Sequence, residues 1–108
     1  MAQDRYLLVL CTVPSVEEAR QIGTLLIELQ AAACVNLVPS VESIYRWEGE
    51  IQNSTEAMLL IKTTENNYPE LEARIREKHP YSNPEIVAVP IERGAAAYLG
   101  WVSEVTRD

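Results

Sequence analysis

The sequence predicts an α+β domain in which helices cover one face of an antiparallel sheet. Three observations support this prediction: residues 5–13 form a continuous apolar run, two later stretches show helical periodicity, and a long pair of strand-like arms lies between those stretches. The resulting order is strand–helix–strand–strand–helix–strand followed by a C-terminal helix. This is the ferredoxin-like split β-α-β (βαββαβ) pattern with a long hairpin. A chain of 108 residues suffices for one domain, so we assign residues 1–108 to it.

The first strand and the first helix are marked by their boundaries. Residues 5–13, RYLLVLCTV, are apolar almost throughout, as expected for a buried central strand, and Pro14 ends the run. Ser15 follows, with Glu18 three residues later, and this spacing predicts a capping box at a helix N-terminus. Apolar residues then recur at helical spacing, so we expect the helix to extend to about residue 33.

A long hairpin is predicted for the next segment. Residues 34–48 form its first arm, a turn lies at 48–50, and residues 51–63 return. Pro39 has no N–H to donate to a neighbouring strand, so it indicates an edge position or a bulge. Each arm of about 13 residues spans roughly 40 Å, against roughly 30 Å for the first strand. The hairpin must therefore project past the core.

The projecting part of the hairpin carries Ile44, Tyr45 and Trp47 towards its tip. Exposed aromatic side chains and open strand edges favour association with a partner. The alternative is that Tyr45 and Trp47 fold back onto their own domain. A chain this short has little spare core to cover them, so we expect the hairpin to be an arm that joins copies of the chain.

The second helix is expected between two prolines. Pro69 is tolerated in the first turn of a helix, with either Asn67 or Thr64 as the N-cap residue, and Pro80 ends the helix. Its apolar face is formed by Tyr68, Leu71 and Ile75.

Two more elements complete the pattern. Residues 85–91 form a short apolar strand, in which Pro90 indicates an edge position. Residues 95–105 form the last helix, whose apolar face consists of Tyr98, Val102 and Val105.

His79 is the only histidine in the sequence. Its side chain lies about 20° around the helix axis from that of Tyr68, so it points to the packed face. On this pattern alone, a structural histidine at the helix C-terminus is favoured over a metal ligand. The predicted strand order, however, brings Cys11 towards the segment that begins just after His79. A thiolate and an imidazole suit copper, but two ligands leave such a site incomplete.

Cys11 and Cys34 are the only cysteines. We expect them at opposite ends of the sheet, too far apart for a disulfide, and therefore as free thiols. Nucleophilic catalysis by Cys11 with His79 as the base would need an orienting acid, and none stands at a recognisable spacing. The sequence also has no glycine-rich phosphate loop, so we do not expect an enzyme.

The charge and hydropathy of the chain exclude some classes of partner. The net charge is −7, with 16 acidic against 9 basic residues, and an acidic surface repels nucleic acid. No stretch of 18 uncharged apolar residues is present, so we expect no membrane span. The N-terminal residues lack a positively charged region and a cleavage site, so we expect a cytoplasmic protein.

Several stretches resemble the CutA family of divalent-cation tolerance proteins. They are VLCTVPS at 9–15, AAACVNLVP at 31–39, SIYRWEGEI at 43–51, EAMLLIKT at 56–63, HPYSNPEIVAVPI at 79–91 and YLGWV at 98–102. The resemblance covers nearly the whole chain. It implies a ferredoxin-like fold, a homotrimer similar to the PII signalling proteins with clefts between its subunits, and binding of copper(II) or another divalent cation.

The copper-binding pattern of that family combines the cysteine that ends the first strand with two adjacent histidines before Pro-Tyr. Cys11 and His79 match this pattern, whereas Lys78 stands in place of the second histidine, and a protonated lysine repels a cation. The resemblance thus leaves two functions open: a cation-binding trimer, or a PII-like trimeric sensor or scaffold for which metal is incidental. In the second case the cleft would take a small anionic ligand, and its candidate lining residues are Trp47, Lys62, Lys78 and Glu85.

Overall fold

The computed structural model describes residues 5–107 and confirms the predicted order of elements. A short 3₁₀ turn at Glu65–Asn67 precedes the second helix. The strands and helices are β1 (Tyr6–Val13), α1 (Val16–Glu28), β2 (Cys34–Trp47), β3 (Glu50–Thr64), α2 (Tyr68–Lys78), β4 (Ile86–Ile91) and α3 (Ala96–Val105).

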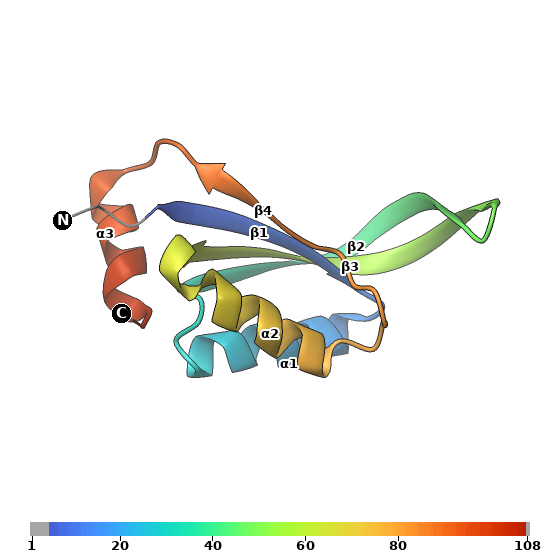
Figure 1. Ribbon diagram of the computed structural model, residues 1–108, viewed down its shortest axis with the longest axis horizontal. Coiled ribbons are helices and arrows are strands. Elements are labelled where there is room, and N and C mark those ends of the chain that lie inside the picture. The colour runs from blue at the N-terminus through green and yellow to red at the C-terminus, as the bar shows by residue number, and fades with distance from the viewer. Residues whose placement is uncertain (1–4, 108) are drawn as a thin grey trace.

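The four strands form one antiparallel sheet in the order β2-β3-β1-β4, with α1 and α2 side by side beneath it and α3 at one end (Figure 1). Successive side chains of a strand point to opposite faces. In β1, Val9, Cys11 and Val13 face the helices and are fully buried in the core, where they pack with Ile22 and Leu26 of α1. Helices α1 and α2 therefore cover the same face of the sheet, and α3 reaches the other face at one end, where Ser103 contacts the hydroxyl of Tyr6 (Figure 1).

The hairpin of β2 and β3 projects beyond the rest of the sheet, as predicted (Figure 1). β1 pairs with β3 only between Ala57 and Thr64, so the outer half of the hairpin has no third strand beside it. At its tip, Glu48 and Gly49 have φ angles of 52° and 82°, which a two-residue type I′ turn requires. The prediction for Pro39 is also confirmed, because β2 is an edge strand whose register shifts between residues 38 and 41.

Helix α1 ends at Glu28, five residues before the predicted end. Gln30 adopts a φ of 59°, its N–H donates to the carbonyl of Ile27, and the N–H of Ala31 donates to the carbonyl of Leu26. This is a Schellman motif with glutamine in the left-handed position that glycine usually takes. Alanine favours helix wherever the backbone permits it, so the periodicity of the sequence did not reveal this stop.

Of the two residues that the sequence offered as the N-cap before α2, Thr64 takes that role and Asn67 does not. Thr64 accepts the N–H of Asn67 at 3.3 Å, so the threonine caps the helical segment, whereas the side chain of Asn67 makes no capping bond to the helix. At the other end, His79 is extended, with φ −76° and ψ 135°, because the residue before a proline disfavours the helical region.

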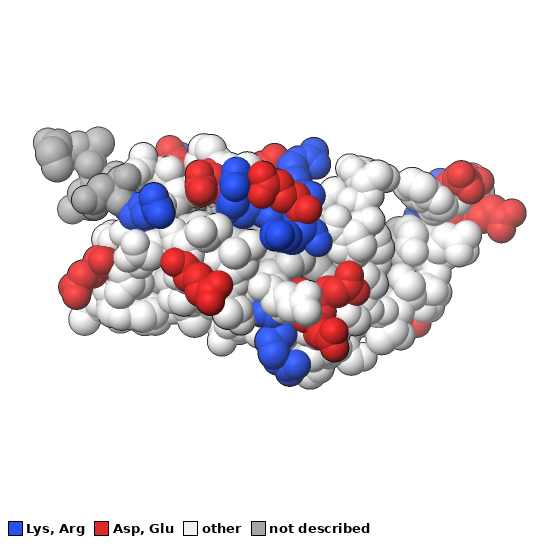
Figure 2. Space-filling view, turned by 90° about the horizontal axis from the view of Figure 1, so that it is seen from below, with Lys and Arg blue, Asp and Glu red and all other residues white. Residues whose placement is uncertain are grey.

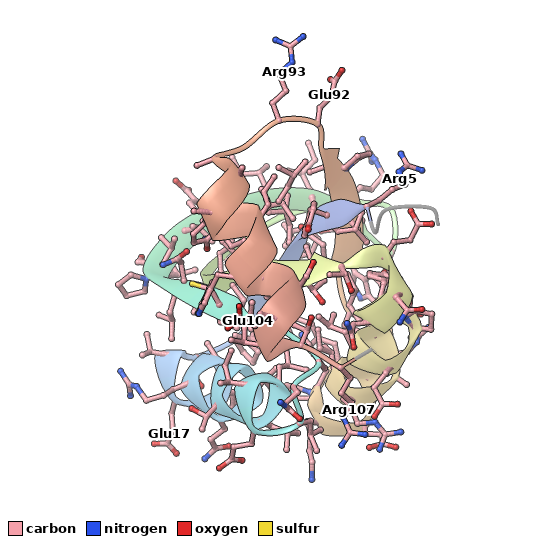
Figure 3. All side chains as sticks on the ribbon, turned by 90° about the vertical axis from the view of Figure 1, so that its left-hand side faces the viewer. Arg5, Glu17, Glu92, Arg93, Glu104 and Arg107 are labelled. Atoms are coloured by element: carbon pink, nitrogen blue, oxygen red, sulfur yellow. The ribbon has the colours of Figure 1, made fainter. Side chains whose placement is uncertain are left out.

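The C-terminal segment after α3 is hydrogen-bonded to the layer formed by α1 and α2. Arg107 donates from Nε to the carbonyl of Leu29 at 2.9 Å and from its backbone N–H to the carbonyl of Gln30 at 3.0 Å. The amide of Asn67 donates to the carbonyl of Arg107 at 2.8 Å. Figure 3 shows Arg107 below the end of α3, where α1 and α2 meet. These bonds anchor the C-terminal segment on α1 and on the start of α2.

Both cysteines are free thiols, but their predicted placement needs correction. Cys34 lies opposite Lys62 of β3, and Lys62 also pairs with Leu8, three positions before Cys11. The two cysteines are thus offset by roughly 10 Å along the strands, with β3 between them, rather than placed at opposite ends. The reason is that β2 begins level with Leu8, the third residue of β1, because the buried residues 31–33 before it already bond to Lys62 and Thr63 at that end of β3.

Candidate functional site

His79 lies at the end of α2 with 8% of its surface exposed, on the packed face as the helical spacing predicted. Its Nδ1 accepts the backbone N–H of Tyr81 at 3.1 Å, and its Nε2 lies 2.7 Å from the carbonyl oxygen of Thr12. A backbone N–H can only donate and a carbonyl can only accept. The ring is therefore the Nε2–H tautomer, with both nitrogens already engaged.

Cys11 is fully buried beside the same carbonyl group. Its Sγ lies 3.8 Å from the oxygen of Thr12. Burial, and to a smaller extent the carboxylates of Glu85 and Glu56, raise the pKa of the Cys11 thiol to about 12. The thiolate is the form that attacks substrates or binds metals, so at neutral pH Cys11 is poorly suited to either role.

A metal centre at this position would need both donors to change their contacts. Cys11 and His79 do approach each other, as the strand order indicated, but both contact the Thr12 carbonyl. Within residues 5–107, no group of three or more His, Cys, Asp or Glu side chains is arranged to hold a metal ion. As they lie in one chain, these residues do not fit a bound cation, and their role as metal ligands stays a prediction.

Tyr81 lies next to His79 and Glu56 lies next to Tyr81, and neither was proposed as a site residue from the sequence. The hydroxyl of Tyr81 donates to Oε2 of Glu56 at 2.9 Å, and its ring centroid lies 4.8 Å from that of His79. Burial, followed by the hydrogen bond to Glu56, raises the pKa of Tyr81 to about 12. Glu56 is itself buried in β3, and a carboxylate in a buried strand position was the signal that was available in the sequence.

The four residues predicted to line a ligand cleft do not come together in one chain. Trp47 is exposed at the tip of the hairpin, opposite Glu50. Lys62 lies twelve residues further along β3, roughly 40 Å away, where its ammonium group contacts the side chain of Asn36. Lys78 lines a shallow hollow against α1, and Glu85 precedes β4. Only neighbouring copies of the chain could unite such distant residues.

The second face of the sheet is apolar and lacks a helical cover over most of its length (Figure 1). It carries the side chains that alternate with those of the core, and Leu10 of β1 is flanked by Leu60 of β3 and Val87 of β4. Val87 and Val89 are 48% and 45% exposed. We call this surface the open face; its apolar residues are Leu8, Leu10, Val38, Met58, Leu60, Val87 and Val89.

The opposite side of the molecule has a different character. Figure 2 shows the layer of α1 and α2, where basic and acidic side chains lie next to one another. Arg74, for example, contacts Glu77 at 3.2 Å and Glu70 at 3.8 Å on α2. Mixed charges of this kind belong to a solvated surface. The open face and the hairpin are therefore the surfaces of this domain that favour a partner.

Fold and surfaces together define a ferredoxin-like α+β domain with an extended hairpin and one uncovered sheet face. The family model described as "CutA1 divalent ion tolerance protein" matches residues 7–105. The chain belongs to this family, as the motifs in the sequence predicted.

Similar proteins agree with this assignment. The "Divalent-cation tolerance protein CutA" of Thermus thermophilus is 52% identical over 98 residues, which are 91% of this chain and 95% of that protein. A solved structure of the divalent cation tolerance protein from the same organism superposes with a TM-score of 0.93 at 50% identity, covering 94% of this chain and 99% of the other.

More distant relatives show the same fold in other organisms. CutA1 from Oryza sativa superposes with a TM-score of 0.94 at 38% identity, over 96% of this chain and 95% of the other. "Protein CutA" of Mus musculus is 41% identical over 88% of this chain, and the matched part is only 54% of the mouse protein. The chain thus spans about half the length of that relative. Among residues 5–107, no helix has the length and apolarity needed to cross a membrane.

Proposed function

We propose that this protein serves divalent-cation tolerance as a cytoplasmic homotrimer, and that it carries out no catalytic step. The observation that supports the proposal most strongly is the open face. Contiguous exposed apolar surface is rare on a protein that works alone, and this chain exposes it on a sheet whose two edge strands are also unpaired. The relative from Thermus thermophilus bears the name of a tolerance protein, not of an enzyme.

The hairpin supports assembly independently of the open face. Ile44 and Ile51 lie on one side of it and are 68% and 72% exposed, whereas Tyr45 and Trp47 lie on the other side. A hairpin that is apolar on both sides buries neither side within its own chain. The partner that is always present with this chain is a second copy of it, so we propose that the hairpin packs against a neighbouring copy.

The number of copies follows from symmetry and from the resemblance to the family. β2 and β4 are the two edges of the sheet, and they differ in length and sequence. When one edge of a chain contacts the other edge of the next, the contact is head-to-tail, and such contacts form a ring where the rotation between neighbours closes and a filament where it does not. We take the ring to contain three subunits, as the resemblance implies.

The cation, in this proposal, is bound between subunits. Cys11 and His79 already use their donor atoms on Thr12 within the chain, so they do not form a complete site. A cleft between two copies offers donors from both. The same cleft gives the second candidate function, a PII-like sensor or scaffold for a small anionic ligand. The positive charges of Lys62 and Lys78 favour that candidate, provided that assembly brings them to one cleft.

Light scattering tests the assembly. One chain has a mass of 12.1 kDa, so a trimer has about three times that mass. A mass equal to that of one chain, measured at micromolar concentration, would reject the proposal.

A thermal-shift screen separates the two candidate functions. A ligand that binds only the folded assembly raises the melting temperature in proportion to the logarithm of its concentration. Divalent cations form one arm of the screen, and nucleotides and small carboxylates form the other. A shift with cations alone supports the tolerance role, and a shift with an organic anion alone supports the sensor.

A further inference from the structure

We propose that Tyr81 is a positioning residue that fixes the direction of the β2–β3 hairpin, by joining Glu56 at the hairpin base to His79 at the end of α2. This inference goes beyond the proposed function, which requires the hairpin but does not say what holds it.

Glu56 occupies the point at which the hairpin leaves the sheet. Ala57, the next residue, forms the last pair of β3 with β1, opposite Val13. Glu56 itself pairs only with Val41 of β2. From Glu56 outwards the hairpin is a two-stranded ribbon, and such a ribbon is marginally stable in water without a third element to support it.

A chain of polar contacts leads from the core to this point. His79 is held by the Thr12 carbonyl of β1 at 2.7 Å, and Nδ1 of His79 holds the N–H of Tyr81 at 3.1 Å. The hydroxyl of Tyr81 then reaches Oε2 of Glu56 at 2.9 Å. His79 and Glu56 are each 8% exposed, whereas Tyr81 between them is 39% exposed, so both ends of the chain of contacts are shielded from water and its middle is partly open. The chain thus connects the central strand to the base of the hairpin through the segment after α2.

No other side-chain hydrogen bond in residues 5–107 joins the outer hairpin to the rest of the domain. The remaining bonds of the outer hairpin stay inside it: Asn53 to Glu42, Ser54 to Tyr45, and Arg46 to the carbonyl of Gly49. The ion pairs within the described chain also lie elsewhere, at Arg5 and on α2. The bond from Tyr81 to Glu56 therefore has no substitute of its kind.

The test compares Tyr81→Phe with Tyr6→Phe in the full-length protein. Each substitution removes one tyrosine hydroxyl bond, since the hydroxyl of Tyr6 contacts that of Ser103 at 2.7 Å. Tyr6 lies at the other end of β1, far from the hairpin. The measurement is amide hydrogen exchange in the outer hairpin and in β1, together with the fluorescence anisotropy of Trp47 in a Trp101→Phe background.

We expect Tyr81→Phe to accelerate exchange in the outer hairpin about tenfold, as the loss of a charge-assisted hydrogen bond predicts, and to lower the anisotropy of Trp47. Exchange in β1 should stay unchanged, and Tyr6→Phe should leave the hairpin as it is. Glu56→Gln retains an acceptor for the tyrosine hydroxyl, so its hairpin should exchange more slowly than that of Glu56→Ala. Glu56→Ala added to Tyr81→Phe should have no further effect, because the two residues act through one bond.

Equal hairpin exchange in the wild type and in Tyr81→Phe would overturn the proposal, as would additive effects of Tyr81→Phe and Glu56→Ala. Light scattering of each variant measures the number of subunits separately, so that exchange is compared only between proteins in the same state of assembly. A monomeric wild type with a Tyr81-dependent hairpin would reject the trimer and support the positioning role. A trimeric wild type whose hairpin exchange is the same in Tyr81→Phe would support the trimer and reject the positioning role.

Discussion

The Nε2 atom of His79 and the carbonyl oxygen of Thr12 lie 2.7 Å apart, so the C-cap residue of α2 is hydrogen-bonded to the central strand. This bond occupies one of the two nitrogens with which His79 would bind a metal, and Tyr81 occupies the other. Cys11, the second predicted ligand, is buried with its Sγ 3.8 Å from the same carbonyl oxygen. The relationship therefore bears directly on where a divalent cation binds.

The first prediction concerns copper(II) binding by the double variant Cys11→Ser, His79→Ala. We expect its affinity to equal that of the wild type, because neither side chain presents a free donor atom in the folded chain. Isothermal titration of both proteins at the same subunit concentration measures this. Circular dichroism of the double variant is the control for folding, since both residues are buried. A loss of affinity of tenfold or more with the fold retained would show that the contacts to Thr12 open and that the pair binds the ion.

The positions of Cys11 and His79 could be predicted from the sequence, whereas their hydrogen-bond partners could not. Helical spacing from Tyr68 placed His79 on the packed face, and the strand order brought Cys11 close to it. Both steps depend on backbone periodicity alone. The partners of the imidazole depend on the path of the segment after Pro80, for which no periodicity exists, so the bonds to Thr12 and Tyr81 were not predictable.

The fold shows the same division. Apolar alternation and turn residues predicted the four strands and the long hairpin, and Pro39 correctly marked the bulged edge strand. The predicted end of α1 was wrong because Gln30 adopts a left-handed backbone conformation, which a glutamine in the sequence does not indicate. The candidate cleft residues illustrate a second limit, since Trp47 and Lys62 lie far apart in one chain. Residues that meet only between copies leave no pattern within one sequence.

The second prediction concerns Cys11 at alkaline pH. Its pKa is raised from 9.0 to about 12, so the folded state favours the protonated thiol. The stabilisation from this shift is complete below pH 9 and is lost as the pH rises from 9 through 12, by at most roughly 4 kcal/mol. Urea unfolding across this range should show a shallower decline for Cys11→Ala than for the wild type. Parallel curves for wild type and Cys11→Ala would contradict the assigned shift.

The third prediction concerns the open face. Val87→Glu should dissociate the assembly, because a carboxylate would be buried without a partner where β4 meets a neighbouring copy. Ile27→Glu is the control: Ile27 is 42% exposed on α1, close to the 48% of Val87, but it lies on the helical side. Light scattering should report one chain for Val87→Glu and the wild-type mass for Ile27→Glu. If Ile27→Glu dissociates the protein and Val87→Glu does not, the helical layer is the interface.

The fourth prediction concerns the end of α1. Gln30 holds a φ of 59°, a conformation that costs a residue with a side chain about 1–2 kcal/mol and costs glycine almost nothing. Gln30→Gly should therefore raise the free energy of unfolding by about 0.5–1 kcal/mol, after allowance for the greater freedom of glycine in the unfolded chain. Gln21→Gly provides a control of opposite sign. Gln21 is exposed within the same helix, where glycine should lower the free energy of unfolding by about 1 kcal/mol.

Urea denaturation at one fixed protein concentration measures both variants, because the stability of an assembly depends on subunit concentration. The backbone carbonyl of Gln30 accepts the N–H of Arg107, and glycine keeps that carbonyl, so the C-terminal anchor remains in Gln30→Gly. A gain for Gln30→Gly with a loss for Gln21→Gly would locate the effect in the left-handed backbone of residue 30. If Gln30→Gly is destabilised as much as Gln21→Gly, the backbone at residue 30 is helical in solution, and α1 continues into the alanine run as its periodicity first predicted.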